Sequence, residues 1–147
     1  MANGLHINPT LFNKYIKNIE KKIDKKIDEV DKEFEAGMVD IVTMAKQLVP
    51  VAPDGGLLKN SINFKKDKQK LSYTLIANTR YAAYVEFGTG KYAKNYVSGL
   101  EEYWKKLARR YYKNGKGKTD KQPFLYPSII QNLPKIYLRI KNIIKVK

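Results

Sequence analysis

Cysteine and histidine, which carry much of the nucleophilic and metal chemistry of proteins, are almost absent from this sequence. It contains no cysteine and one histidine, His6. The lack of cysteine excludes a disulfide framework, a thiolate metal site and a cysteine nucleophile. A single histidine leaves no Ser/His/Asp triad unless the N-terminal segment reaches a distant site. We therefore expect neither a metal ion nor another cofactor.

Two short segments match catalytic motifs only in part. Gly88-Thr89-Gly90-Lys91 has the ending of a phosphate-binding loop, but that motif requires Gly at position 85 and Ser or Thr at position 92. The sequence has Val85 and Tyr92 there, so this is not a P-loop. Glu86 has the chemistry of a general base, but acid–base catalysis needs a second group and the sequence places none. We therefore expect a protein that is not an enzyme.

Acidic residues gather in the N-terminal third of the chain, where they alternate with lysines. This mixture is typical of a solvated helix face on which neighbouring side chains form ion pairs. A zinc or two-metal site would need a cluster of His, Asp and Glu side chains, which the spacing does not provide. The acidic residues concerned are Asp24, Asp28, Glu29, Asp31, Glu33 and Glu35.

Basic residues are the strongest chemical feature. Lys and Arg number 29 against 14 Asp and Glu, a net charge of +15, of which residues 91–147 carry +12. Seven of the eleven tyrosines fall between Tyr81 and Tyr112. A basic, aromatic helix face predicts a salt-sensitive contact with a phosphate backbone or docking on an acidic protein surface, although a merely solvated face has the same pattern. The candidate contact residues are Lys105, Lys106, Arg109, Arg110, Lys113, Lys116 and Lys118.

A single folded domain must position these side chains. A chain of 147 residues can bury one core, and 43% hydrophobic and 12% aromatic residues are enough to fold it despite its charge. The sequence shows no secretory signal pattern and no run of about 18 apolar residues. We expect a soluble protein that does not enter a membrane, with one domain over residues 1–147 that is organised as residues 1–50, 51–90, 91–122 and 123–147.

The N-terminal third predicts one long helix. Asn8 and Pro9 are residue types preferred at the N-cap and at the first helical position, and Pro50 closes the segment. Between them the apolar residues recur with a mean step of 3.6 residues, the period of a straight helix with one apolar stripe. Gly37 lowers helix propensity, but the stripe continues in phase after it, which favours one continuous helix. The stripe consists of Phe12, Ile16, Ile19, Ile23, Ile27, Val30, Phe34, Met38, Ile41, Ala45 and Leu48.

Residues 51–90 predict a turn followed by an antiparallel hairpin. Proline and two glycines within residues 51–56 favour the turn. A first strand is expected over residues 61–66, with Ile62 and Phe64 on one face, and a short polar link joins it to a second strand. The aromatic segment over residues 81–90 fits a short helix and a strand equally. The inward residues of the second strand are Leu71, Tyr73, Leu75 and Ala77.

Two more helices are predicted towards the C-terminus. Ser98 and Glu101 have the spacing of a capping box, in which the two side chains satisfy the first free amides of a helix. Residues 116–122 predict a flexible basic loop. Pro127 is suited to open a final helix, which Pro134 would kink or restart. The apolar faces are Leu100, Tyr103, Trp104, Leu107 and Tyr111 on the first helix and Ile136, Ile140 and Ile143 on the second.

Three segments, in order, have the pattern of one protein family. Residues 49–62 contain a proline turn followed by Asp-Gly-Gly-Leu-Leu-Lys-Asn-Ser-Ile, residues 81–89 are Tyr-Ala-Ala-Tyr-Val-Glu-Phe-Gly-Thr, and residues 123–128 are Pro-Phe-Leu-Tyr-Pro-Ser. Together they resemble the tail-completion or head–tail joining (neck) proteins of tailed bacteriophages, the gene-ten-product-like family of lambdoid siphophages. The middle block is the most specific. Gly55 stands where the family usually has Thr, and residues 90–122 are longer and more basic than is usual.

The resemblance implies an α+β fold, with a long N-terminal helix packed on a small twisted antiparallel sheet and additional C-terminal helices. It implies a virion structural protein of the tail or neck, assembled in the host cytoplasm. Its partners would be copies of itself in a ring around the DNA channel and the neighbouring connector, tail-tube or tail-terminator proteins, with no membrane. The basic segment, and not the resemblance, leads us to expect that it faces an acidic neighbour, either another neck protein or, through a non-specific contact, the genomic DNA. The implied structural or interface residues are Asp54, Gly55, Gly56, Leu57, Ser61, Tyr81, Tyr84, Glu86, Phe87, Gly88, Thr89, Pro123, Phe124 and Pro127.

The residue types predict roles within these blocks. Leu57 and Ile62 are expected in the core. Apolar residues surround Glu86, so its carboxylate needs partners either in the core or at a subunit interface. Pro123 and Pro127 bracket a short segment that we expect to be an extended anchor.

Two other functions fit the sequence. The first is a basic protein that binds nucleic acid non-specifically, with the aromatic helix as its platform. The second is a protein that lies on a membrane surface through its basic C-terminal helix, which fits less well because Pro134 interrupts the apolar face. A gene located between the connector and tail-tube genes would favour the neck protein over both.

Overall fold

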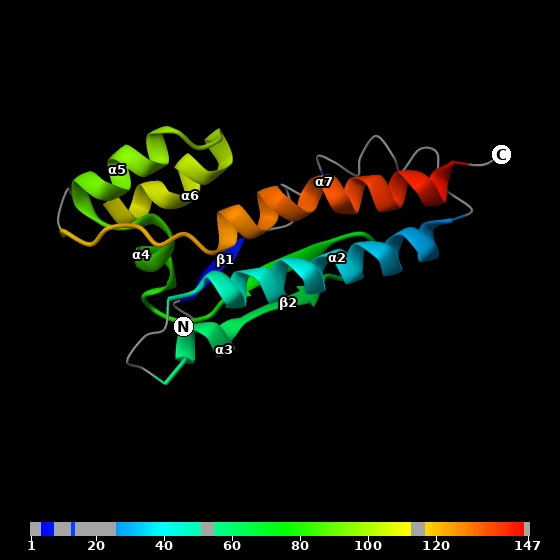
Figure 1. Ribbon diagram of the computed structural model, residues 1–147, viewed down its shortest axis with the longest axis horizontal. Helices are drawn as coiled ribbons and strands as arrows, with labels where there is room; N and C mark the ends of the chain where they lie inside the picture. The colour runs from blue at the N-terminus through cyan, green and yellow to red at the C-terminus, as the bar shows by residue number, and fades with distance from the viewer. Residues whose placement is uncertain (1–3, 8–12, 14–25, 51–54, 113–116, 146–147) are drawn as a thin grey trace.

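The computed structural model describes residues 4–7, 13, 26–50, 55–112 and 117–145 (Figure 1). The fold is α+β, as predicted. Its elements are β1 (Leu5–Ile7), α2 (Ile27–Leu48), α3 (Leu57–Ser61), β2 (Ile62–Lys66), β3 (Tyr73–Ala77), α4 (Ala82–Phe87), α5 (Gly90–Ser98), α6 (Glu102–Tyr112) and α7 (Leu125–Ile144).

The three strands form one antiparallel sheet in the order β1-β3-β2. The predicted hairpin is confirmed, since Ile62 lies opposite Ala77 and Phe64 opposite Leu75. Every second residue of β3 is fully buried, which is the alternation the sequence shows. The sequence does not predict β1, where His6 lies opposite Ile76, because three residues are too few to show an alternation.

The apolar stripe of α2 packs on this sheet. Val30, Phe34 and Met38 have at most 1% of their surface exposed, and the helix runs through Gly37 without a break, as the phase of the stripe predicts. The prediction is wrong at the C-terminal end, where Leu48 is 41% exposed and Val49 is buried instead. The chain leaves the helix at Val49, whose extended backbone turns its side chain inward. Of the predicted helix before Lys26, only residue 13 belongs to the described residues.

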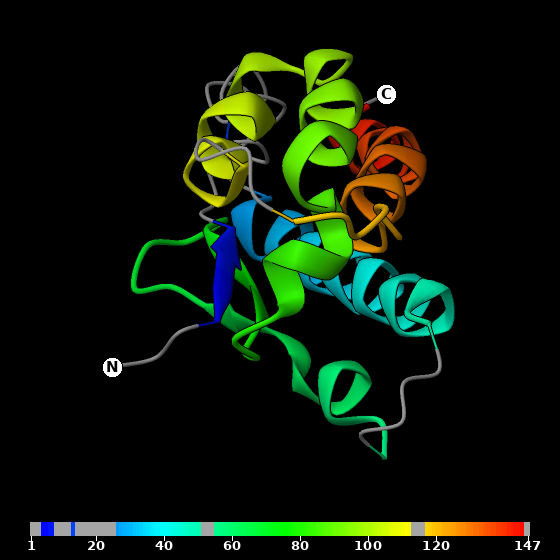
Figure 2. The same cartoon turned by 90° about the vertical axis from the view of Figure 1, so that its left-hand side faces the viewer.

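α7 runs antiparallel to α2 along the long axis of the molecule (Figures 1 and 2). Gly37 allows close packing, because a Cβ atom there would lie 2.5 Å from Cδ1 of Ile136. At the outer edge, Arg139 forms ion pairs of 2.9 Å with Glu33 and with Asp40. α7 continues through Pro134 rather than restarting there. Proline has no N–H to donate to the carbonyl one turn earlier in the helix. Because Pro134 is exposed, that carbonyl lies on the solvent side of α7.

Helices α4, α5 and α6 follow β3 in the chain, contact one another and form a group at the end of the molecule where α7 begins (Figure 1). The aromatic segment that the sequence left open is α4 and the beginning of α5. The predicted capping box is wrong, because Ser98 is the last residue of α5 and α6 begins at Glu102. The Ser98 hydroxyl instead donates to the carbonyl of Asn95 at 2.8 Å. This hydrogen bond to a carbonyl three residues earlier competes with the N-cap role of Ser98, which explains why the capping-box spacing of Ser98 and Glu101 did not locate the start of α6.

Candidate functional site

The most specific sequence block, residues 81–89, contains a buried carboxylate that holds the start of another helix. Glu86 lies in α4 and is 0% exposed. Its Oε2 atom accepts hydrogen bonds of 2.8 Å from the backbone amides of Phe124 and Leu125. Its Oε1 atom accepts a bond of 2.9 Å from the amide of Tyr126. Glu86 therefore ties residues 81–89 to residues 123–128, which are nearly forty positions further along the chain.

These three amides are those that begin α7. The first amides of any helix lack a partner within the helix and need an acceptor from elsewhere. Phe124, at the N-cap of α7, provides no capping side chain of its own. Pro127 follows the three donors and has no N–H, so the first turn presents no fourth amide. The Glu86 carboxylate, at the positive end of the helix dipole, serves as the cap from a distance.

This geometry corrects the extended anchor expected between Pro123 and Pro127. Phe124 is fully buried, but the chain is already helical from Leu125 onward, and the amides of both residues are bound by Glu86. The hydroxyl of Ser128 also donates to the carbonyl of Phe124. Proline at position 127 thus serves the first turn of a helix and not an extended strand.

Glu86 is unsuited to catalysis. Burial raises the pKa of its carboxyl above the usual value, and the three amide hydrogen bonds, which favour the carboxylate, oppose that rise. The side chain has no exposed surface through which a substrate would reach it. The described residues also contain no group of three or more His, Asp or Glu side chains that could hold a metal ion. The carboxylate is a structural acceptor within one chain.

Backbone bonds strengthen the same junction. The amide of Thr89 donates to the carbonyl of Thr119 at 2.9 Å, and the amide of Thr119 donates to the Thr89 hydroxyl at 2.9 Å. The amide of Gln122 donates to the carbonyl of Val85 at 2.7 Å. Gly88 has φ of 76°, and a Cβ atom there would lie 2.8 Å from the Thr119 carbonyl oxygen. Glycine is therefore required both by the backbone conformation and by the close approach.

Aromatic side chains fasten α6 to this junction. Trp104, fully buried, makes edge contacts with Tyr126 and Phe87, with ring centroids 5.1 and 6.2 Å apart. Tyr111 stacks on Phe87 at 6.4 Å and contacts Tyr84 edge-on at 5.8 Å. Such contacts contribute about 0.5–1.5 kcal/mol each beyond their buried area. The predicted apolar face of α6 is thus confirmed as a packing surface.

The other residues of blocks 81–89 and 123–128 have smaller roles at this junction. Tyr81 is the N-cap residue of α4, and its buried hydroxyl has no hydrogen-bond partner in the part of the chain that the structure describes. Tyr84 is 42% exposed, and Pro123 is partly buried.

The first block, residues 49–62, lies elsewhere, where α3 contacts α2, β2 and β3. Gly55 and Gly56 have φ of 69° and 84°, which confirms the predicted turn, and Asp54 lies outside the described residues. Ile62 is fully buried as expected, but the expectation for Leu57 is wrong: it is 61% exposed, and Leu58 is buried instead. Each residue advances a helix by about 100°, so only one of two adjacent leucines can face the core. The Ser61 hydroxyl donates to the carbonyl of Leu58 at 2.7 Å.

The candidate basic residues gather on the outer side of α6 and the segment after it. Lys106, Arg109 and Lys118 are exposed, whereas Lys105 forms an ion pair of 3.1 Å with Glu102. The side chain of Arg110 and residues 113–116, including Lys113 and Lys116, lie outside the described residues. Residues 117–122 are irregular, as predicted, and the bonds of Thr119 and Gln122 attach them to the junction.

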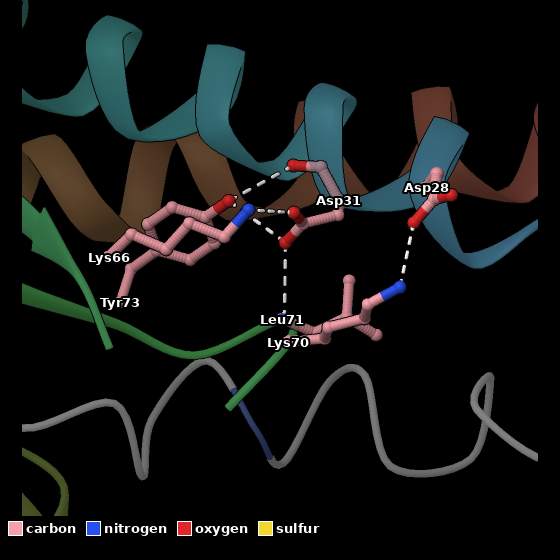
Figure 3. Close-up of polar contacts among 6 residues, drawn as sticks. All are labelled: Asp28, Asp31, Lys66, Lys70, Leu71 and Tyr73. Carbon is pink, nitrogen blue, oxygen red and sulfur yellow. Dashed lines mark hydrogen bonds and ion pairs between the residues drawn. The ribbon is translucent and has the colours of Figure 1, made fainter. Parts of the chain in front are cut away.

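A second polar cluster, around Asp31, is one that the sequence pattern misassigned (Figure 3). Asp31 was expected to pair with neighbouring lysines on an exposed face, but it is 7% exposed and faces the hairpin. It forms an ion pair with Lys66 and accepts bonds of 2.9 Å from the Tyr73 hydroxyl and 3.1 Å from the Leu71 amide. Its position one helical turn before Phe34, on the apolar stripe, is the signal that marks it as buried.

The Asp31 cluster fixes the hairpin to the start of α2. Leu71 has φ of 60°, a left-handed conformation that is unfavourable for a leucine. The hydrogen bond from its backbone amide to the Asp31 carboxylate helps to hold this conformation. Burial acts to raise the pKa of Asp31, but the hydrogen bonds from Lys66, Tyr73 and Leu71 outweigh burial and lower it below its usual value. At the exposed end of the cluster, Asp28 pairs with Lys70 at 2.9 Å.

The fold and these two clusters define an α+β scaffold whose buried carboxylates serve to hold its own helices and strands together. Comparison with known proteins identifies the family of this scaffold. Residues 12–88, just over half of the chain, match the family model described as "Bacteriophage HK97-gp10, putative tail-component". The chain belongs to this HK97-gp10-like family, which confirms the resemblance drawn from the sequence blocks.

Family membership makes the protein a structural component of a bacteriophage tail and therefore of the virion. The match contains the first block and all of the second block except Thr89, and it ends before α5, so the basic helices and residues 123–128 lie beyond it. No match was found among the curated proteins or among the solved structures. No described helix combines the length and the apolar character that crossing a bilayer requires.

Proposed function

We propose that this tail component completes the tail or joins it to the head, as a non-enzymatic part of the neck. Copies of the chain would assemble into a ring around the DNA channel and contact the connector on one side and the tail-tube or tail-terminator protein on the other. The family match over residues 12–88 carries the proposal, because it covers the scaffold from α2 to α4. The organisation of the polar and apolar side chains supports it.

The buried carboxylates of this scaffold accept hydrogen bonds from backbone amides and side chains of the same chain. Contacts with other proteins must therefore be made by the outer surface. Large apolar side chains are exposed there on three separate helices: Val39 on α2 is 50% exposed, Leu57 on α3 is 61% exposed and Leu138 on α7 is 56% exposed. A ring needs two different surfaces on each copy, because contacts between its subunits are head-to-tail. Apolar side chains that are exposed on more than one helix of a subunit suit such contacts.

The test is the mass of the purified protein in solution, measured by light scattering at low and high salt and again after addition of purified tail tubes. A discrete oligomer, or a monomer that joins tail tubes, is the expected result. Leu138→Glu should abolish that assembly without changing the thermal unfolding of the monomer, because the side chain is exposed. Gln69→Glu, at an exposed polar position of the loop between β2 and β3, is the control. A wild-type monomer that binds no tail tube or connector would overturn the proposal.

The alternative is a free-standing protein that binds nucleic acid. The basic outer side of α6 is the observation that favours it. Such a protein would bind a DNA duplex with a steep salt dependence but would not be recovered in purified virions. Its presence at constant copy number in virions would exclude this alternative.

A further inference from the structure

The surface of α5, α6 and the segment that follows them is strongly basic. Within residues 90–121 the described residues include eight Lys or Arg against three acidic residues, Glu101, Glu102 and Asp120. Glu102 and Asp120 already pair with Lys105 and Lys121. The exposed cations, which we call the basic surface, are Lys91, Lys94, Lys106, Arg109 and Lys118.

The basic surface lies on helices that are packed against the rest of the protein. The inner side of α6 is fully buried at Trp104 and Ala108, so its outer side must face away from the scaffold. No acidic residue follows Glu102 in this helix. The pair of hydrogen bonds between Thr89 and Thr119 joins the beginning of α5 to the segment after α6. The backbone that carries these cations is therefore already ordered, so little backbone freedom is lost when they bind.

Another copy of the chain is a poor source of the opposite charge. Of the eleven carboxylates in the described residues, six already pair with Lys or Arg of the same chain. Glu86 is buried, and Asp67 accepts bonds from Ser72 and Thr74. Glu29, Glu35 and Glu101 are left outside these contacts. Each added copy also brings a net charge of +15, so repulsion between copies opposes their association, and a bound polyanion would reduce that repulsion.

We propose that the basic surface binds the phosphate backbone of double-stranded DNA, without reading its sequence. The proposal rests on the proposed function, since a component of the neck would meet the genome. A duplex presents one negative charge per about 1.7 Å of its axis, which is a denser array than an ordinary protein surface offers. Lys and Arg side chains bind phosphate oxygens whatever the neighbouring base, so a surface made of these residues fits the backbone of the duplex.

The test compares two triple variants with the same charge. Lys106→Gln/Arg109→Gln/Lys118→Gln alters the basic surface, and Lys135→Gln/Lys141→Gln/Lys145→Gln alters exposed lysines of α7 and its C-cap. A fluorescent duplex of random sequence is titrated at several salt concentrations. Each lost phosphate contact makes the slope of log K against log salt less steep by about 0.9. The slope of the first variant should therefore be shallower by about three, and its affinity near 0.1 M salt should fall on the order of 100-fold. The second should keep the wild-type slope.

Thermal unfolding of both variants at the wild-type temperature shows that neither is misfolded. Equal loss in the two variants would mean that net charge alone attracts DNA, and the basic surface would be rejected. Wild-type protein that binds no duplex would also overturn the inference, as would a first variant that keeps DNA affinity but no longer binds connector or tail tubes. The solution mass reports on the ring independently, so failure of the DNA contact and failure of the proposed function are distinguishable.

Discussion

Replacing Glu86 tests whether one buried carboxylate joins α4 to α7. Glu86→Ala removes the acceptor of the Phe124, Leu125 and Tyr126 amides and leaves a cavity in a fully buried site. Each buried donor left without an acceptor costs about 1–3 kcal/mol, and part of this is recovered where water enters. We expect a loss of about 3–5 kcal/mol in the free energy of unfolding. For a chain of this size that lowers the melting temperature by about 2–4 °C per kcal/mol.

Glu86→Gln separates the hydrogen bonds from the volume of the side chain. Its carbonyl oxygen can take the place of Oε2 and keep the bonds from Phe124 and Leu125, but its NH2 group then faces the Tyr126 amide, donor against donor. The negative charge at the helix N-terminus is also lost, which costs about 0.3–1 kcal/mol. We expect a total loss of about 1–3 kcal/mol. The exposed Glu35→Gln is the matched control and should change stability by less than about 0.5 kcal/mol.

The assay is urea unfolding at pH 7, followed by circular dichroism, together with hydrogen exchange of the backbone amides. In Glu86→Gln the amide of Tyr126 should exchange faster than in wild type, while the amides in the middle of α2 should change only with global stability. A Glu86→Gln protein as stable as the Glu35→Gln control, with unchanged exchange at residues 124–126, would refute the capping role.

Three further predictions concern other contacts. The pKa of Asp31 is below its usual value of 3.8, so the stability that this carboxylate provides is present above that pH and is lost as the pH falls towards its folded pKa. In Asp31→Asn, the free energy of unfolding measured with urea should therefore depend less on pH below about pH 4 than it does in wild type. An unchanged pH dependence would contradict the assignment. On a solvent-exposed helix Gly37→Ala would add about 1 kcal/mol of stability. Here the new Cβ atom would meet Ile136, so we expect the free energy of unfolding, measured with urea, to fall by about 1–3 kcal/mol. A gain in stability would show that α2 and α7 are less closely packed. Gly88→Ala should cost more than Gly55→Ala, because both glycines have positive φ but only the Cβ at residue 88 would meet backbone atoms; equal melting temperatures would mean that the contact with Thr119 is dispensable.

The elements that the sequence predicted well are those that local periodicity specifies. The stripe through Phe34 and Met38 locates α2, and the alternation from Tyr73 to Ala77 locates β3, because each pattern extends over several residues. β1 has only three residues and acquires its structure by pairing with β3, about seventy positions away. The Ser98 pattern failed because a side chain has two local bonding choices and the tertiary structure selects one.

The site was predictable only in part. The sequence indicates that the Glu86 carboxylate needs partners, either in the core or at a subunit interface, and the resemblance joins residues 81–89 and 123–128 in one family pattern. Neither indicated that the partners were backbone amides of α7, because backbone donors leave no trace in residue types. The burial of Asp31 was visible in its position on the apolar stripe, but its charge led to the expectation of a solvated side chain. Sequence patterns thus identify which groups are buried more readily than what satisfies them.

The clamp between Thr89 and Thr119 has a consequence for how such a protein changes during evolution. Because the two ends of the intervening segment are hydrogen-bonded to each other, its entry and exit are fixed relative to the scaffold. Trp104 and Ala108 are fully buried, so the inner side of α6 is constrained as well. Substitutions on the outer side of α6 can therefore change its charge to suit a different neighbour while the helices and sheet beneath remain as they are.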